Sequence, residues 1–531
     1  MKLLSQISSQ VLLGFVLTTS LPANTAPLLV AADGDLIANG IALKVSGSPA
    51  IGGVGCVAFR AVLSGKAVTE KNRIAIVAYS NGVPTIVVRT GDVDPITGAV
   101  FNQLSDPILS STGILVFLGS LKPGTGDATK TNSTGIWKYQ KGKLGLIIRA
   151  GAQVPDFEAP STSFLVNFNQ IAVNDWGGVV FTSSIERSGS KHIRALFASH
   201  FSGGLFLSEF IGEEFTFYGY GGWVAGLGVL KPLPHVCGQG RTLVENGDYI
   251  FSPKMRAFSS DPSNPYDAGV LRPFHFGLFF QKDDSADESG AGIPGGPPPP
   301  SYTAQFKLHE AIINNSNQVV VRAIVVDQGY GPTNNTVIAT VFNSVLNSSF
   351  QFLVRTGDAA PDVFGRTGDA TYSELGDPIL NNNGHIAFLA HVHGPRHSNT
   401  LGVWSDADGI MKRIVAVGDI EPGGSGAKFQ DFDQIVLPDV GGVIIEADVG
   451  GSGVRKQGLW AVGENGALQR LLLEGDTLDF HGSPKTLKRF RIFQIPSHFA
   501  GQTRSFDPGT RSLIFQAIFS DGSWGIYRIS P

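Results

Sequence analysis

The stretch Asn381-Asn382-Asn383-Gly384-His385-Ile386-Ala387-Phe388 decides the fold, because weaker copies of it recur along almost the whole chain. Each copy places an apolar pair three residues after a turn residue. The pairs are Ala58-Phe59, Val116-Phe117, Val180-Phe181, Ile250-Phe251, Val320-Val321, Ala387-Phe388, Ile444-Ile445 and Leu513-Ile514-Phe515. The turn residues are Gly55, Gly113, Gly177, Gly247, Gly384 and Gly441, with Asn317 and Arg511 in the other two copies. The mean period of about 65 residues predicts a repeat architecture.

Two further signals follow the apolar pairs in a constant order. The first is an aromatic residue: Tyr79, Trp137, Phe197, Phe279, Phe342, Trp404, Trp460 and Tyr527. The second is an apolar strand that closes in Gly-Asp or an eroded form of it: Gly91-Asp92, Gly151-Ala152, Gly212-Glu213, Gly357-Asp358, Gly418-Asp419 and Gly475-Asp476. An identical Asp-Pro-Ile-Leu precedes two of the pairs, at 106–109 and 377–380. The constant order indicates that every copy is the same structural unit.

The residue types within the unit predict an all-β protein. β-branched and aromatic residues fill the segments, Gly, Asn and Pro separate them, and sustained helical periodicity is missing. A unit of about 65 residues holds about four short strands, which is typical of a propeller blade. We interpret the octet as a hairpin turn in which Gly384 accepts a positive φ and Asn381 caps the backbone.

The two ends of the chain complement each other. The last copy lacks its Gly-Asp strand, whereas Leu28–Asp35 near the N-terminus resembles Leu471–Asp476 in character. An N-terminal strand that completes the last blade would remove exposed sheet edges. We therefore predict a single β-propeller over residues 27–531, with eight four-stranded blades and the last blade closed by the N-terminal strand. Seven blades and a separate hairpin is the alternative.

The repeat resembles that of the secreted bacterial choice-of-anchor tandem-repeat proteins, which are defined by an NxxGxxAF motif. The match is literal at Asn381, Gly384, Ala387 and Phe388 and partial in the other copies. The blades are also similar to those of TolB-type β-propellers. This resemblance implies a propeller outside the cytoplasm and implies no catalytic residue. Family members often end in a membrane or sorting anchor, and no long apolar segment follows Tyr527.

The N-terminus predicts export. Residues 1–26 combine Met1-Lys2 with the apolar run Val11–Leu17 and then small residues, as in a secretory signal peptide. We expect a secreted, periplasmic or cell-envelope protein, probable transmembrane segments being excluded because no later run is long enough. Residues 283–301 are polar and then Pro/Gly-rich, which favours a flexible insertion within a blade. Cys56 and Cys237 fall in distant blades, so we expect two separate thiols, with a bridge as the alternative.

Charge and loop lengths indicate the kind of partner. The formal net charge is −4 and only 16% of residues are charged, without a basic stripe, which argues against nucleic-acid binding. The long loops are expected to gather on one face of the propeller. They are 92–101, 121–133, 358–374 and 421–429. Because loops on rigid scaffolds carry function, we predict that this long-loop face binds a partner.

Four features have both a structural and a chemical interpretation. The acidic series Asp35, Asp92, Glu213, Asp358, Asp419 and Asp476 caps turns, with calcium binding as the alternative. His391, His393 and His397 have a spacing that zinc can use, although a polar strand end is the preferred interpretation. The repeated aromatics are assigned to the core, and not to sugar stacking. Ser505–Gly509 resembles an Asp-box turn, which is itself structural.

These observations favour a non-enzymatic, monomeric propeller that binds a protein or a surface glycan and needs no cofactor. One alternative is a hydrolase or lyase acting on polysaccharide at the central channel, and another is a structural envelope or matrix component. The sequence assigns neither catalytic nor metal-binding residues, and motifs such as Gly-x-Ser-x-Gly or a phosphate loop are missing.

Overall fold

The computed structural model describes most of residues 26–153 and 305–531 and, between them, the strands β12 to β21 with residues 177–178. Gaps in the two long ranges fall at 38–39, 53–54, 111, 315–317, 327–330, 332, 345–346, 396, 425, 452, 464, 493–504 and 508–509. Several predicted features lie outside the described residues: the signal peptide, the 283–301 insertion, Cys237, Gly247, Ile250-Phe251, Phe279, Asn317 and Glu213.

The described residues form strands and no helix, which confirms the all-β prediction. The first sheet contains β2 (Ala42–Val45), β3 (Ala50–Gly52), β4 (Cys56–Ser64), β5 (Ile74–Ser80) and β6 (Val83–Arg89). The second contains β7 (Phe101–Leu104), β8 (Ile108–Leu109), β9 (Leu115–Leu121), β10 (Thr134–Gln140) and β11 (Lys143–Arg149). The third contains β12 (Phe164–Val173), β13 (Val179–Glu186), β14 (Ile193–Ser199) and β15 (Leu207–Gly212).

The middle of the chain continues this series. The fourth sheet contains β16 (Thr216–Phe217), β17 (Gly222–Gly226), β18 (Lys254–Ala257) and β19 (Pro265–Asp267). A two-stranded sheet follows, made of β20 (Leu271–Arg272) and β21 (Gly277–Leu278). The fifth sheet contains β22 (Gln305–Ile313), β23 (Val319–Val326), β24 (Thr336–Ser344) and β25 (Asn347–Arg355).

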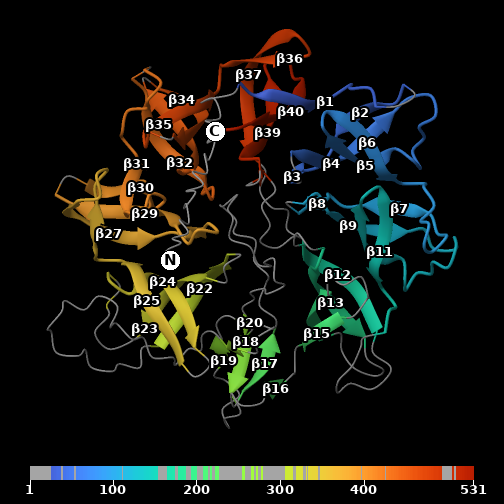
Figure 1. The fold of residues 1–531 in the computed structure, drawn as a ribbon, viewed down its shortest axis with the longest axis horizontal. Coiled ribbons are helices and arrows are strands. Elements are labelled where there is room, and N and C mark those ends of the chain that lie inside the picture. Colours follow the sequence, from blue (N-terminus) through green and yellow to red (C-terminus); the bar gives the residue numbers. More distant parts are fainter. Residues whose placement is uncertain are drawn as a thin grey trace, which may run out of the picture.

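The C-terminal part completes the series, and the sheets follow one another around a common centre (Figure 1). The sixth sheet contains β26 (Ala359–Pro361), β27 (Thr367–Leu375), β28 (Ile379–Leu380), β29 (Ile386–Gly394), β30 (His397–Ser405) and β31 (Lys412–Ala416). The seventh contains β32 (Lys428–Val436), β33 (Ile444–Gly451), β34 (Val454–Val462) and β35 (Leu468–Leu473). The eighth contains β36 (Thr477–Phe480), β37 (Ser483–Ile492), β38 (Phe506–Asp507), β39 (Ser512–Phe519), β40 (Trp524–Ile529) and β1 (Leu28–Ala32).

Strand β1 joins the two ends of the chain. It pairs antiparallel with β40, from Leu28 opposite Arg528 to Ala32 opposite Gly525. The N-terminal segment therefore lies in the same sheet as the C-terminal strands, beside the first sheet (Figure 1).

Several sheets depart from four plain strands because their first strand is broken in two. Strands β7 and β8 pair with opposite ends of β9, and β27 and β28 do the same with β29. The break falls at Asp106-Pro107 and Asp377-Pro378. Proline has no N–H to donate, so it interrupts the ladder at these points. Residues 358–374, predicted as a loop, instead contain the hairpin β26–β27.

The repeated apolar pairs form the core, as predicted. Every described pair lies in the strand that follows the repeated turn, and Phe59, Phe117, Phe181, Phe388 and Phe515 are fully buried. The aromatic on the next strand stacks on this phenylalanine in four sheets: Phe59–Tyr79, Phe117–Trp137, Phe388–Trp404 and Phe515–Tyr527. The assignment of these aromatics to the core is confirmed.

The repeated turn does more than reverse the chain. The described turn glycines, including Gly384 (φ +88°), are left-handed, and Arg511 adopts φ +49° at the glycine position of its copy. A Cβ on Gly384 would lie 2.5 Å from Oε1 of Gln318 in the fifth sheet, and one on Gly441 would lie 2.5 Å from Nη2 of Arg511 in the eighth. The interpretation of the octet as only a turn was therefore incomplete, because these glycines also admit side chains from neighbouring sheets.

Two copies of Asp-Pro-Ile-Leu receive an arginine from the preceding sheet. Nε of Arg60 in β4 lies 2.9 Å from Oδ1 of Asp106, and Nε of Arg322 in β23 lies 2.6 Å from Oδ1 of Asp377. Each arginine directly follows an apolar pair. The motif thus accepts an ionic contact between consecutive sheets.

Candidate functional site

Sheet topology gathers two sets of loops at one end of each sheet. In an antiparallel four-stranded order, the loop into the first strand and the loop from the second to the third strand share an end. We call this the long-loop end. In the second sheet it carries residues 90–100 and 122–133, which bring the predicted loops 92–101 and 121–133 together.

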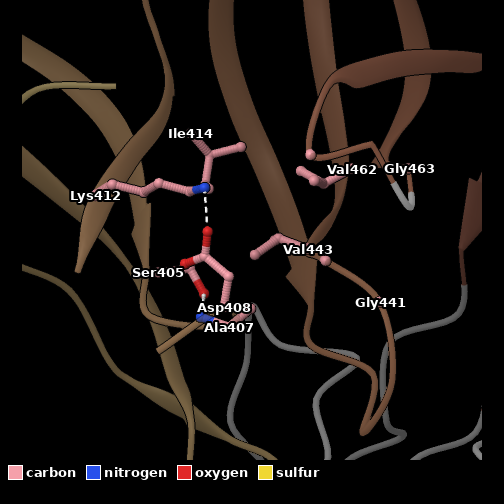
Figure 2. A pocket seen from close by; sticks show the side chains of 11 residues that line it. Ser405, Ala407, Asp408, Lys412, Ile414, Gly441, Val443, Val462 and Gly463 are labelled. Atoms are coloured by element: carbon pink, nitrogen blue, oxygen red, sulfur yellow. Dashed lines mark hydrogen bonds and ion pairs between the residues drawn. The ribbon is translucent and has the colours of Figure 1, made fainter. Parts of the chain in front are cut away.

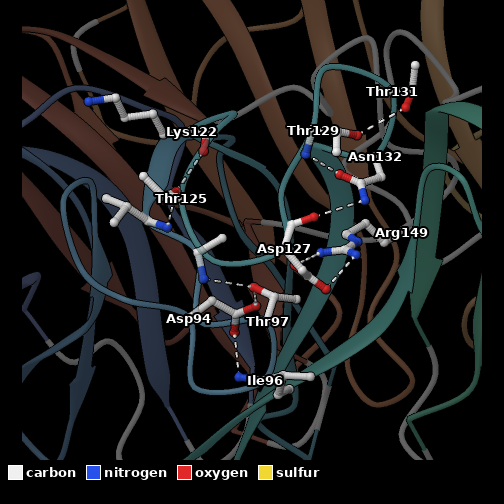
Figure 3. Close-up of polar contacts among 12 residues, drawn as sticks. Asp94, Ile96, Thr97, Lys122, Thr125, Asp127, Thr129, Thr131, Asn132 and Arg149 are labelled. Carbon is white, nitrogen blue, oxygen red and sulfur yellow. Dashed lines mark hydrogen bonds and ion pairs between the residues drawn. The ribbon is translucent and has the colours of Figure 1, made fainter.

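Hydrogen bonds hold these two loops to each other (Figure 3). Oγ1 of Thr125 accepts from the Val100 N–H at 3.0 Å and donates to the Lys122 carbonyl at 2.6 Å. The carboxylate of Asp94 is fully buried and accepts from Oγ1 of Thr97 at 2.7 Å. Buried polar groups with satisfied partners rigidify their surroundings, so this loop pair is a fixed surface.

A bidentate ion pair supports the outer part of the same surface. Nη1 and Nη2 of Arg149 lie 2.6 and 2.9 Å from the two carboxylate oxygens of Asp127 (Figure 3). The hydrogen bond from Arg149 is the largest influence on Asp127 and lowers the pKa of its carboxyl group. Both side chains are thereby fixed within the protein.

Exposed aliphatic side chains occupy a repeated position at the long-loop end. The residue after the Gly-Asp aspartate is Leu36, Val93 or Ile420 at three junctions, with exposures of 68, 61 and 65%. Each forms an isolated β-bridge with the chain that enters the next strand. Ile96 is exposed on the same loop as Val93. The backbone of these residues is fixed while their side chains face solvent.

The Gly-Asp carboxylates have a structural role, as predicted. One oxygen of each described aspartate accepts the backbone N–H three residues earlier, at 2.8–2.9 Å: Asp35, Asp92, Asp358, Asp419 and Asp476. The other oxygen of Asp92 accepts from Nε of Arg89 at 2.9 Å. A side chain that closes its own turn in this way holds the end of the preceding strand.

The histidines lie where the sequence placed them, in β29 and at the start of β30. His391 and His393 are two residues apart in β29, and Nδ1 of His391 lies 3.4 Å from the Asn399 carbonyl oxygen. His397 pairs with Gly394, and its side chain is outside the described part. Within that part, the structure shows no group of three or more His, Cys, Asp or Glu side chains arranged to hold a metal ion.

Two further sequence features take structural positions. Asp507, in the stretch that resembles an Asp-box, is buried and accepts from Oγ1 of Thr510 at 2.6 Å, as a turn residue does. Cys56 is a half-buried free thiol at the start of β4. Burial raises the pKa of this thiol to about 11, which keeps it protonated and unreactive.

A small pocket lies between the sixth and seventh sheets, away from the long loops. It has a volume of about 190 Å³ and is lined by the β30–β31 and β34–β35 turns and by Gly441 and Gly442. An ion pair between Lys412 and Asp408 spans its wall (Figure 2). Burial opposes ionisation of Asp408, but the hydrogen bond and charge of Lys412 outweigh it and lower its pKa.

The sequence gave no warning of a buried acid, Glu446. Its side chain is in β33, directly after the pair Ile444-Ile445, and the residue is 4% exposed. Oε1 accepts from Nε2 of Gln457 at 2.6 Å, while Oε2 has no hydrogen-bond partner. Burial, and then the charge of Asp433, raises the pKa of Glu446 to about 8. Its position matches that of Arg60 and Arg322, which was the available signal.

The geometry defines an all-β protein whose sheets follow one another around a centre, with a rigid loop surface at one end of the sheets. The chain belongs to DUF7453, a family of unknown function, which it matches over residues 22–209 and 264–530. No curated protein matches the chain.

Solved structures show distant likeness. The β-propeller domain of the Trilobed protease from Pyrococcus furiosus is 10% identical, with a TM-score of 0.32 over 81% of this chain and 97% of that one. An acylaminoacyl peptidase from Pyrococcus horikoshii is 10% identical, with a TM-score of 0.35 over 80% of this chain and 52% of that one. This chain therefore spans about half of the peptidase. A polysaccharide lyase, PL25 ulvan lyase, is 11% identical, with a TM-score of 0.23 over 83% of this chain and 96% of that one.

No helix in the described ranges is long and apolar enough to cross a membrane.

Proposed function

We propose that this chain is a secreted or envelope-located, non-enzymatic β-propeller that binds a protein or a surface glycan at its long-loop end. In this proposal the eight sheets of four or more strands are eight blades, and the pairing of β1 with β40 closes the ring. The repeated NxxGxxAF motif and the signal-peptide-like residues 1–26 support the secreted family and its compartment.

One observation carries the proposal: Leu36, Val93 and Ile420 are exposed aliphatic residues at equivalent positions on hydrogen-bonded turns. They bury little surface in the fold, so folding alone does not account for their apolar character at a recurrent site. Exposed apolar side chains on a rigid support are suited to binding, because little conformational entropy is lost on association.

The test compares the purified wild-type protein with a Leu36→Ser/Val93→Ser/Ile420→Ser variant against a glycan panel and fractionated envelope proteins. The matched control is Val83→Ser, because Val83 is equally exposed but lies in the β5–β6 hairpin at the opposite end of its sheet. We expect the triple variant to lose at least tenfold in affinity and the control to retain it. Absence of any ligand, or cleavage of a polysaccharide by the wild type, contradicts the proposal.

A further inference from the structure

The turn between β26 and β27 presents an exposed aromatic residue on a fixed backbone. Oδ1 of Asp362 accepts from the N–H groups of Phe364, at 2.8 Å, and Arg366, at 3.0 Å. Oδ2 accepts from Nε and Nη2 of Arg366 at 3.1 and 2.9 Å. The backbone closes the same turn through Asp362 N–H to Arg366 O, at 2.8 Å. We call residues 362–366 the Phe364 tip.

The tip is also fastened to the body of the sixth sheet. The Asp362 carbonyl accepts from the Arg413 N–H at 3.1 Å. The neighbouring Pro361 carbonyl accepts from Nε1 of Trp404, a core residue, at 3.1 Å. Gly365 packs so closely on Ile410 that a Cβ there would lie 2.7 Å from its Cγ2. The tip is therefore part of the rigid structure and holds Phe364 in place.

Phe364 and Ile410 expose an apolar surface at this tip. Their exposures are 72 and 59%, and Val363 beside them is partly exposed. The guanidinium of Arg366 lies 4.7 Å from the centre of the Phe364 ring. Rigid aromatic and arginine side chains with aliphatic neighbours are the residue types that dominate protein–protein binding energy.

The saturation of the polar groups at the tip decides between the two ligand classes. Asp362 accepts four hydrogen bonds from within the turn, and Arg366 directs Nε and Nη2 to it. A sugar needs polar groups that converge on its hydroxyls, and those at the tip are already engaged. An apolar protein pocket needs only the ring and the aliphatic surface, and the paired charges present no net charge to its rim.

We propose that the Phe364 tip is an anchor that inserts into an apolar pocket of a protein partner. The inference rests on the proposed binding function and narrows its ligand from a protein or a glycan to a protein. Because the tip is preorganised, binding orders little of this chain. Because Asp362 neutralises Arg366, salt has little effect on affinity.

The first experiment identifies the partner. A photo-crosslinking phenylalanine derivative replaces Phe364, and in a second sample Val83, and both proteins are irradiated in an envelope extract. The protein that crosslinks only at position 364 is purified. Its affinity is then measured by calorimetry for the wild type and for Phe364→Ser, Ile410→Ser and Val83→Ser, each with its thermal unfolding midpoint.

We expect Phe364→Ser and Ile410→Ser to weaken binding at least tenfold without shifting the unfolding midpoint, and Val83→Ser to bind as the wild type does. Unchanged affinity of Phe364→Ser overturns the inference but leaves the proposed function standing. Crosslinking to a second copy of this chain, or loss of binding to a glycan panel on substitution of Phe364, also overturns it. If the wild type binds neither protein nor glycan, the proposed function itself fails.

Discussion

Nδ2 of Asn381 donates a hydrogen bond to the carbonyl oxygen of Pro438 over 3.0 Å and thereby links the sixth sheet to the seventh. Oδ1 of the same side chain accepts from the N–H groups of Asn383 and His385, at 3.1 and 2.9 Å. The Asn381 carbonyl accepts from Nδ2 of Asn314, at the end of the fifth sheet, at 2.9 Å. One residue of the octet thus closes its own turn and connects three consecutive sheets.

Replacing Asn381 by alanine should destabilise the protein by about 2–3 kcal/mol, because three side-chain hydrogen bonds are lost at a buried position. Urea unfolding followed by tryptophan fluorescence measures the change. Asn102→Ala is the control, since Asn102 is exposed in β7 and should cost less than about 0.5 kcal/mol. Equal effects of the two substitutions would contradict the role of Asn381.

Gly52 makes a second contact between sheets that has no room for a side chain. A Cβ at Gly52 would lie 2.1 Å from the backbone oxygen of Ser110, so either the first or the second sheet would have to shift. We expect Gly52→Ala to cost about 3 kcal/mol in unfolding free energy. Gly368→Ala, at an open position in β27, should be neutral or slightly stabilising. A cost below about 1 kcal/mol for Gly52→Ala would show that the seam relaxes.

The sequence predicts the parts of this fold that depend on local pattern. The apolar pairs, the stacking aromatics and the Gly-Asp turns repeat, and each copy confirms the interpretation of the others. The capping role of Asp92, for example, requires only the N–H three residues earlier. The β1 strand was recognisable because its sequence resembles the Gly-Asp strand that the last copy lacks.

Contacts between sheets escaped prediction because they join unlike residues far apart in the chain. Arg322 and Asp377 are separated by 55 positions, and Asn381 and Pro438 by 57. Neither member of such a pair reveals its partner from sequence type or spacing alone. The exposure of Phe364 was likewise hidden, because residues 358–374 were taken for a loop and the aromatic signal is normally a core signal.

The Arg322–Asp377 ion pair offers a direct measure of coupling between sheets. A double-mutant cycle with Arg322→Met and Asp377→Asn should give a coupling energy of about 1–2 kcal/mol, since both side chains are about three-quarters removed from solvent. The exposed pair Arg73–Glu70 should give less than about 0.5 kcal/mol in the same experiment. Equal coupling in the two cycles would argue against any special contribution at the sheet junction.

The two tryptophans Trp137 and Trp404 differ in one hydrogen bond. Nε1 of Trp404 donates to Pro361, whereas Nε1 of Trp137 is buried without a partner. Replacement of either by phenylalanine removes a similar volume, so the difference between the two costs isolates the hydrogen bond. Trp404→Phe should be more destabilising than Trp137→Phe by about 1 kcal/mol in urea unfolding. The reverse order would show that packing dominates at these positions.

Glu446 should make stability depend on pH. Its folded-state pKa of about 8 exceeds the ordinary value of 4.5, because of burial and then the charge of Asp433. Between these values the folded protein holds a proton that the unfolded chain has lost. The contribution of this group to stability is therefore fully present below pH 4.5 and falls by up to about 1.4 kcal/mol per pH unit until about pH 8.

Glu446→Gln should remove that slope, because glutamine fills the same space and cannot ionise. The measurement is the free energy of unfolding in urea at half-unit intervals from pH 5 to pH 9, and its result is the difference between the variant and the wild type at each pH. That difference should grow with pH and level off near the folded-state pKa. Glu374→Gln, at an exposed position in β27, should keep the wild-type slope. If the slope survives in Glu446→Gln, then Glu446 is already ionised in the folded protein and its buried oxygen has a partner.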